Sequence, residues 1–199
     1  MQRWLNKITL SGNFVRLEPL GTEHIPGLIE AAKDGNLWEL WYTSVPDAAG
    51  TEKYVHKALT EYEQEKSLPF AVIDIKSGKV IGSTRYMNAD TVNHRLEIGT
   101  TWYAKSYQKT GVNKECKYLL LQYAFEKLGC IAVEFRTHWH NTPSRNAIAS
   151  LGAKQDGVLR NHLIDSKGNY RDTVVFSILN SEWNAVKTSL EYKLKRYTD

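Results

Sequence analysis

The chain has 199 residues, with 26 lysines and arginines against 22 aspartates and glutamates, and 42% of its residues are hydrophobic. That length and balance predict one folded domain over residues 1–199 and leave too little chain for two full-sized enzyme domains. The most apolar stretch, residues 118–125, is far shorter than the roughly 20 residues of a membrane span, and the N-terminus lacks the apolar run of a signal peptide. We therefore expect a cytoplasmic protein without membrane contact.

Charge and cysteine content narrow the class of ligand. The formal net charge is +4 and no long run of like charges occurs, so dedicated nucleic-acid binding is not implied, although an anionic ligand would be attracted. Cys116 and Cys130 lie in apolar segments and are expected to be buried reduced thiols. His138 and His140 have no third ligand nearby in sequence, so no metal site is expected.

Two helices and a meander are predicted in the first half of the chain. Alternation from Phe14 predicts a strand, Thr22 is expected to cap a helix over 23–33, and a second helical pattern follows Thr51. An aromatic-rich segment, LWELWYTSVP, lies between the two helices. From Pro69 a period of two predicts three successive antiparallel strands, 70–75, 79–87 and 95–104.

The second half alternates between helices and strands. A helix is predicted over 112–128 and a strand over 131–139, and Thr142 with Pro143 opens a helix that Gly152 closes. Two strands and a final helix follow, over 154–163, 173–179 and 181–195. The fold class is therefore α+β with three layers, in which a mixed, mostly antiparallel sheet of about seven strands is flanked by helices; the core runs from about 14 to 179.

The segment KSYQKTGVNKE, residues 105–115, joins a strand to a helix and is the most informative part of the chain. A polar loop that leads into a helix N-terminus presents unpaired backbone N–H groups and the positive end of the helix dipole, which suits phosphate. Lys109 and Lys114 add positive charge. The patterns G-x-x-x-x-G-K-[ST] and G-x-G-x-x-G are absent, which argues against a P-loop NTPase or a Rossmann enzyme.

Three motifs in order carry a family resemblance. Gln108–Asn113, QKTGVN, resembles the Gln/Arg-x-x-Gly-x-Gly/Ala pyrophosphate loop of the GNAT superfamily of acetyl-CoA-dependent N-acetyltransferases. With R-L-E-P-L at 16–20 and N-x-x-S-x-x-A-I-x-x-L-G-A at 141–153, the chain is most similar to the Rim-like branch, which acetylates N-termini of ribosomal proteins and many unrelated amines. Asn113 departs from the family's usual Gly or Ala, but asparagine tolerates positive φ.

The resemblance implies an acyl-CoA N-acyltransferase fold with acetyl-CoA as co-substrate and no metal. In similar proteins the fourth and fifth strands splay apart and the pantetheine arm lies in the gap. The residues that this places at the cofactor are Thr101, Trp102 and Tyr103 on the strand, Gln108, Lys109, Thr110, Gly111, Val112 and Asn113 in the loop, and Asn141 and Arg145 after the fifth strand.

Two residues are candidates for catalysis. Glu97 alternates along its strand with Gly99, Thr101 and Tyr103 and resembles the family's strand-four carboxylate, so we expect a general base that acts through water. The alternative is a carboxylate that merely pairs with a surface arginine. Ser144 lies where the resemblance places the donor to the CoA thiolate, and its alternative is a solvent-exposed first helical turn.

The acceptor side is less defined by sequence. Trp38, Trp41 and Tyr42 lie where relatives build the acceptor wall, although ordinary core aromatics are an equal alternative. Arg171 and Asp172 lie in the last predicted hairpin and either touch substrate or solvate a loop.

The leading hypothesis is an acetyl-CoA-dependent N-acetyltransferase acting on a primary amine, either a peptide N-terminus or a small molecule. The alternative is a non-catalytic acyl-CoA-sensing module, and transfer of longer acyl groups is also open. A homodimer through the C-terminal strands or helix is expected.

Overall fold

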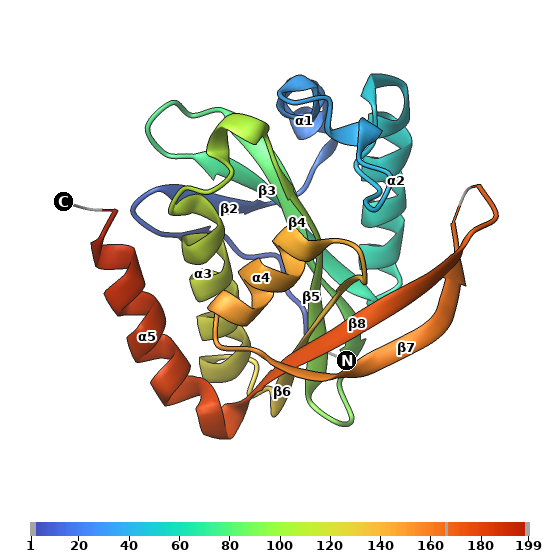
Figure 1. Ribbon diagram of the computed structural model, residues 1–199. Coiled ribbons are helices and arrows are strands. Elements are labelled where there is room, and N and C mark those ends of the chain that lie inside the picture. Colours follow the sequence, from blue (N-terminus) through green and yellow to red (C-terminus); the bar gives the residue numbers. More distant parts are fainter. Residues whose placement is uncertain (1–2, 166, 198–199) are drawn as a thin grey trace.

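The computed structural model describes residues 3–165 and 167–197, and its described strands form one sheet in the order β1-β2-β3-β4-β5-β6-β8-β7 (Figure 1). Neighbouring strands are antiparallel except β5 and β6, which are parallel. The mixed, mostly antiparallel sheet is therefore confirmed. The strand that sequence analysis missed is β1, because two residues are too short to show a period. The strands are β1 (Leu10–Ser11), β2 (Val15–Pro19), β3 (Ser67–Asp74), β4 (Val80–Asp90), β5 (Arg95–Tyr103), β6 (Ala132–His138), β7 (Lys154–Ile164) and β8 (Tyr170–Leu179).

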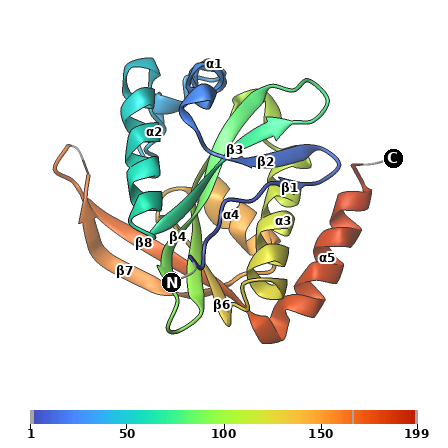
Figure 2. The same cartoon turned by 180° about the vertical axis from the view of Figure 1, so that it is seen from behind.

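The helices cover both faces of this sheet (Figures 1 and 2). α1 and α2 pack on one face and α3, α4 and α5 on the other, with a separate hydrophobic cluster under each set. No helix in the described part of the chain is long and apolar enough to span a membrane. The α-helices are α1 (Ile25–Lys33), α2 (Ala48–Glu63), α3 (Val112–Glu126), α4 (Thr142–Ser150) and α5 (Trp183–Lys195), with short 3-10 turns η1 (Thr22–His24), η2 (Leu37–Glu39), η3 (Lys105–Tyr107) and η4 (Asn180–Glu182).

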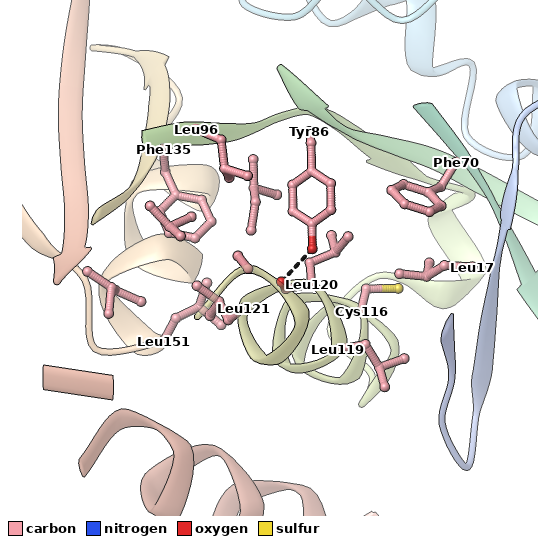
Figure 3. Packing of buried hydrophobic residues seen from close by; sticks show 14 of the residues in the cluster. Leu17, Phe70, Tyr86, Leu96, Cys116, Leu119, Leu120, Leu121, Phe135 and Leu151 are labelled. Atoms are coloured by element: carbon pink, nitrogen blue, oxygen red, sulfur yellow. Dashed lines mark hydrogen bonds between the residues drawn. The ribbon is translucent and has the colours of Figure 1, made fainter. Parts of the chain in front are cut away.

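The larger cluster forms because strand alternation points one set of apolar side chains at α3. On β3, Phe70 faces α3 while Ala71 faces α1 and α2. Tyr86 on β4 is fully buried, and its hydroxyl donates to the Leu120 carbonyl of α3 at 2.5 Å (Figure 3). Cys116 lies in the same cluster and is a buried free thiol, as is Cys130, so that prediction is confirmed.

Two predicted helix caps are wrong. The N-cap of α4 is Asn141, whose Oδ1 accepts from the Ser144 backbone N–H at 3.1 Å, and Thr142 is the first helical residue. Thr22 lies inside the 3-10 turn η1 and caps nothing through its side chain. Several side chains able to cap stand close together at each start, and the backbone conformation decides which one does.

Two element starts also differ from the prediction. α2 begins at Ala48, not after Thr51, because Asp47 caps it by accepting from the Gly50 backbone N–H at 2.7 Å. β8 begins at Tyr170, not at 173, since pairing with β7 continues to the hairpin turn. The hairpin of β7 and β8 projects from the body of the molecule on the side of α2 (Figures 1 and 2).

Candidate active site

The two parallel strands of the sheet separate along their length. β5 and β6 pair only where residues 95–97 meet residues 132–134, whereas β5 continues to Tyr103 and β6 to His138. β5 keeps its pairing with β4 over this distance. Residues 98–103 therefore offer backbone polar groups on the β6 side with no strand partner there, as expected for the splayed strands of the resemblance.

A β-bulge lies in the unpaired part of β5. Trp102 pairs with Ser83 and Gly99 with Arg85, so β5 carries one residue more than β4 over this interval. Thr100 has a φ of 49°, a left-handed conformation that β-branched residues rarely adopt. The bulge is thus a built feature of the strand at the candidate site.

The bulge reverses which residues share a face. Tyr103 packs in the α3-side cluster, and Thr101 accepts a hydrogen bond from Lys117 of α3 at 2.6 Å. Glu97 lies on the opposite face, beside Arg136 and Gly99. The prediction that Glu97, Thr101 and Tyr103 share one face is therefore wrong, because it assumed unbroken alternation along the strand.

Glu97 is a buried carboxylate with polar partners. The residue is 6% exposed, and its Oε2 accepts from Asn88 Nδ2 at 2.9 Å. Arg136 Nε stands 3.6 Å from the same oxygen, beyond hydrogen-bond length, and also pairs with Glu134. Burial raises the pKa of Glu97, and the Asn88 hydrogen bond and the Arg136 charge offset part of that rise. An arginine lies beside Glu97, as the alternative interpretation expects. Because burial nevertheless raises its pKa, the carboxylate is a stronger base than that of an exposed glutamate.

The loop after β5 is held by its own side chains. Gln108 Nε2 donates to the Tyr103 carbonyl at 3.0 Å. Thr110 Oγ1 donates to the Tyr107 carbonyl at 2.7 Å and accepts from the Val112 backbone N–H at 3.3 Å. These bonds fix the path of the chain into α3, whose first N–H groups have no partner within the helix.

The same loop has the shape and charge that an anion needs. Lys109 is left-handed, with φ 62°, and Gly111 is the N-cap of α3. Asn113 and Lys114 lie in the first turn, at the positive end of the helix dipole. These residues fit the pyrophosphate group that the resemblance implies.

Tyr197, which sequence analysis did not consider, lies against this loop. A Cβ on Gly111 would stand 3.0 Å from the Tyr197 ring, and Lys114 Nζ donates to the Tyr197 hydroxyl at 3.1 Å. Tyr197 follows the last predicted helix, so no local signal connected it to the loop. The packing of α5 beside α3 brings it there.

The start of α4 carries three more predicted residues. Asn141 uses Oδ1 for the helix cap, which leaves its Nδ2 as a donor. Ser144 is half-buried, and within the described residues its hydroxyl makes no hydrogen bond. Arg145 is engaged with Trp139: Nη1 donates to the Trp139 carbonyl at 3.2 Å and the guanidinium lies 4.3 Å from the ring centroid.

Trp41 lies at the end of β6. It is 58% exposed, and its ring centroid is 5.1 Å from that of His138, 5.6 Å from His140 and 5.7 Å from Tyr42. Trp38 is 37% exposed and, among the described residues, makes no ring contact. The core-aromatic alternative therefore does not describe the two tryptophans, and only Trp41 and Tyr42 join the histidines in one aromatic cluster.

Residues 15–154 match the acetyltransferase (GNAT) domain family. The class of protein that the fold and this match define is the N-acetyltransferase, and the chain belongs to the GNAT family. The expected resemblance and the acyl-CoA N-acyltransferase fold are thereby confirmed.

Known relatives agree with that assignment. A GCN5-related N-acetyltransferase from Brucella melitensis is 33% identical with a TM-score of 0.85, over 96% of this chain and 86% of that chain. The uncharacterized N-acetyltransferase p20 of Bacillus licheniformis is 30% identical over 114 residues, which are 57% of this chain and 63% of the relative, less than two thirds of its length. Mycobacterium smegmatis RimJ in complex with CoA-disulfide has a TM-score of 0.76 over 90% of this chain and 88% of that chain; at 20% identity the likeness is one of fold alone.

Proposed function

We propose that this protein transfers the acetyl group of acetyl-CoA to a primary amine. The observation that carries the proposal is the arrangement of features along β5. Glu97 is a buried carboxylate, the bulge at Thr100 and the edge without a strand partner follow it, and the loop that suits an anion comes directly after the strand. The three ordered motifs support placement in the Rim-like branch. A single domain, residence in the cytoplasm and a homodimer remain predictions.

Different residues of the chain would bind different parts of acetyl-CoA. The loop 108–113 and the first N–H groups of α3 would hold the pyrophosphate, with Lys109 and Lys114 supplying charge. Backbone groups of residues 101–103 would bond the pantetheine amides along the unpaired edge, and Asn141 would donate from Nδ2. Arg145 is committed to Trp139 in this structure and would have to leave it to meet a phosphate.

Acetyl transfer requires a neutral amine. An α-amino group with a pKa of about 8 is only about one-tenth neutral at pH 7, so a base that removes its proton accelerates attack. Glu97 accepts this proton through a water molecule, and burial makes its carboxylate a stronger base. The amine nitrogen bonds to the thioester carbon and loses a further proton to solvent as the C–S bond breaks. The departing thiolate takes a proton from Ser144, which solvent then reprotonates. The N-terminal end of α4 favours negative charge at that point.

The acceptor lies on the same face as Glu97. Trp41 and Tyr42, with Trp38 at the rim, would form its aromatic wall. Either a peptide N-terminus or a small amine could pack its apolar part against these rings.

Thermal unfolding with acetyl-CoA tests the cofactor, with NAD and ATP as controls. A ligand at a hundredfold above its Kd stabilises the folded state by about 2.7 kcal/mol, which raises the midpoint by about 5–10 °C for a chain of this size. A rise with acetyl-CoA alone supports the proposal. No rise at millimolar acetyl-CoA contradicts it.

Glu97→Gln separates catalysis from sensing. The variant is expected to keep the acetyl-CoA stabilisation and to lose about 10²–10⁴-fold in kcat/KM for thiol release with an amine. Glu30→Gln is the control, because Glu30 is an exposed glutamate of α1 that pairs with Lys33 and does not contact Glu97. Equal rates for wild type and Glu97→Gln across pH would show that Glu97 is not the base, and stabilisation by acetyl-CoA without thiol release for any amine would favour the sensing module.

A further inference from the structure

The face of the sheet that carries Glu97 continues across β6 and β8 and is rich in charge. Glu134, Arg136 and His138 alternate along β6 on that face, since Val133 and Phe135 point into the opposite cluster. Most of these charges are paired, for example Glu134 with Arg95 and Arg136 at 2.6 and 3.0 Å. This face of the sheet is therefore not generally acidic.

Arg171 is different, because it has no anionic partner among the residues that the structure describes. It lies on β8 two residues before Thr173, the residue that pairs with His138, and so points to the same face. The side chain is partly buried, and within the described residues its Nε is shielded from solvent without a hydrogen-bond acceptor. Burial lowers the pKa of the guanidinium, and no nearby carboxylate counteracts this. The two terminal nitrogens are not shielded in this way, and within the described residues they too have no hydrogen-bond or ion-pair partner, so a ligand can reach them.

The two carboxylates nearest in sequence are already used. Asp172 accepts from Arg160 Nε at 2.5 Å and from the Asn161 backbone N–H at 2.8 Å. Asp165 accepts from the side chain and backbone N–H of Asn169 at 3.0 and 2.8 Å. Neither carboxylate forms an ion pair with Arg171.

Arg171 lies on the same face of the sheet as the aromatic cluster. Burial lowers the pKa of His138 and the Arg171 charge lowers it further, whereas the carboxylates of Asp165 and Asp172 raise it. His138 in turn contacts Trp41, the residue that lines the proposed acceptor wall. Two residues of β8 separate Arg171 from the level of His138, about 7 Å along the strand.

We propose that Arg171 binds a carboxylate carried by the amine acceptor, beside the ring cluster of Trp41 and His138. This inference rests on the proposed function and names its substrate class. A guanidinium suits a planar carboxylate because it offers a fork of parallel N–H donors. Arg171 lies two residues beyond the level of His138, so six residues, about 20 Å along the strands, separate its level from that of Glu97, and the carboxylate must stand many bonds from the amine. A short acidic peptide fits this spacing, and a single α-amino acid does not.

The test compares matched tripeptide amides with a free N-terminus, Ala-Ala-Glu and Ala-Ala-Gln, with thiol release as the readout of kcat and KM. Wild type is expected to prefer the glutamate peptide by about tenfold to a hundredfold in kcat/KM, mostly through KM. Arg171→Gln is expected to abolish that preference while its rate with the glutamine peptide stays within about threefold of wild type. Arg171→Lys should keep part of the preference, because it keeps the charge without the fork. Lys33→Gln, which removes one exposed charge on α1, is the control and should behave as wild type.

Calorimetric binding of both peptides to wild type and Arg171→Gln gives a second readout that needs no turnover. Equal affinity and equal rates for the two peptides in wild type would overturn the Arg171 assignment and leave the proposed function standing. Acetyl-CoA binding without thiol release would overturn the proposed function, and the binding preference would then still decide the role of Arg171. An equal loss for both peptides in Arg171→Gln would also refute an acceptor carboxylate at this position.

Discussion

Lys117 on α3 is a buried cation that has no acidic partner among the residues that the structure describes. It is 5% exposed, and its Nζ donates to Thr101 Oγ1 at 2.6 Å and reaches Thr84 Oγ1 at 3.4 Å. Within the described residues it forms no ion pair, and burial lowers its pKa to about 8. Lys117→Met keeps an unbranched side chain of similar length and removes the charge, so we expect it to stabilise the protein at neutral pH.

The size of the effect follows from the pKa. Each tenfold change in proton affinity is worth about 1.4 kcal/mol, so a fall from 10.5 to about 8 costs about 3 kcal/mol of unfolding free energy at pH 7. Loss of the hydrogen bonds to Thr101 and Thr84 returns about 1–2 kcal/mol, because the two hydroxyls still bond each other at 2.7 Å. The net gain is about 1–2 kcal/mol, a rise of about 2–8 °C in the unfolding midpoint.

The dependence on pH gives the sharper test. Between about pH 8 and 10.5 the unfolded chain binds more protons at Lys117 than the folded chain, so wild-type stability rises with pH in that window and the advantage of Lys117→Met disappears. Urea unfolding of both proteins at pH 7, 9 and 10.5 measures this difference, with the exposed Lys33→Met as control. A difference between wild type and Lys117→Met that stays constant from pH 7 to 10.5 would refute the reasoning.

Three further outcomes are expected. Glu115→Ala removes a carboxylate that accepts from three backbone N–H groups of residues 13–15 at 2.7–2.9 Å. It should lower the unfolding free energy by about 3–5 kcal/mol in urea titrations. A loss below about 1 kcal/mol would contradict this expectation. Gly99→Ala places a Cβ 2.6 Å from Met87 Sδ and 2.9 Å from Glu97 Oε1, and it should lower kcat more than it lowers acetyl-CoA binding, as thiol release and ligand-induced thermal shifts would measure. The kcat/KM of wild type should fall as pH drops through the raised pKa of Glu97, a limb that Glu97→Gln should lack; an identical limb in both proteins would assign it to another group.

The sequence by itself determined the order of most helices and strands and the loop that suits phosphate. These features depend on short-range patterns: alternation in residues 70–75 and 79–87, helical spacing in 112–128, and the position of Gly111 at the start of a helix. The loop's hydrogen bonds are equally local, since Thr110 bonds Tyr107 three residues earlier. A local pattern is sufficient wherever the partners are near in sequence.

Tertiary structure decided the rest of the candidate site. The bulge at Thr100 depends on how β5 registers against β4, which alternation along one strand does not encode, and it reversed the face of Thr101 and Tyr103. Arg136 reaches Glu97 only because two distant strands pair in parallel before they separate.

The acceptor side shows the same division most clearly. Trp41 meets His138 only when the segment before α2 folds over the end of β6, and Arg171 joins that face through the register of β8. Tertiary packing decides whether an arginine forms an ion pair. Asp172, for example, is adjacent to Arg171 in sequence but accepts hydrogen bonds from other donors. The sequence supplied the charged and aromatic side chains, and the packing of elements far apart in the chain decided which of them were left for a ligand.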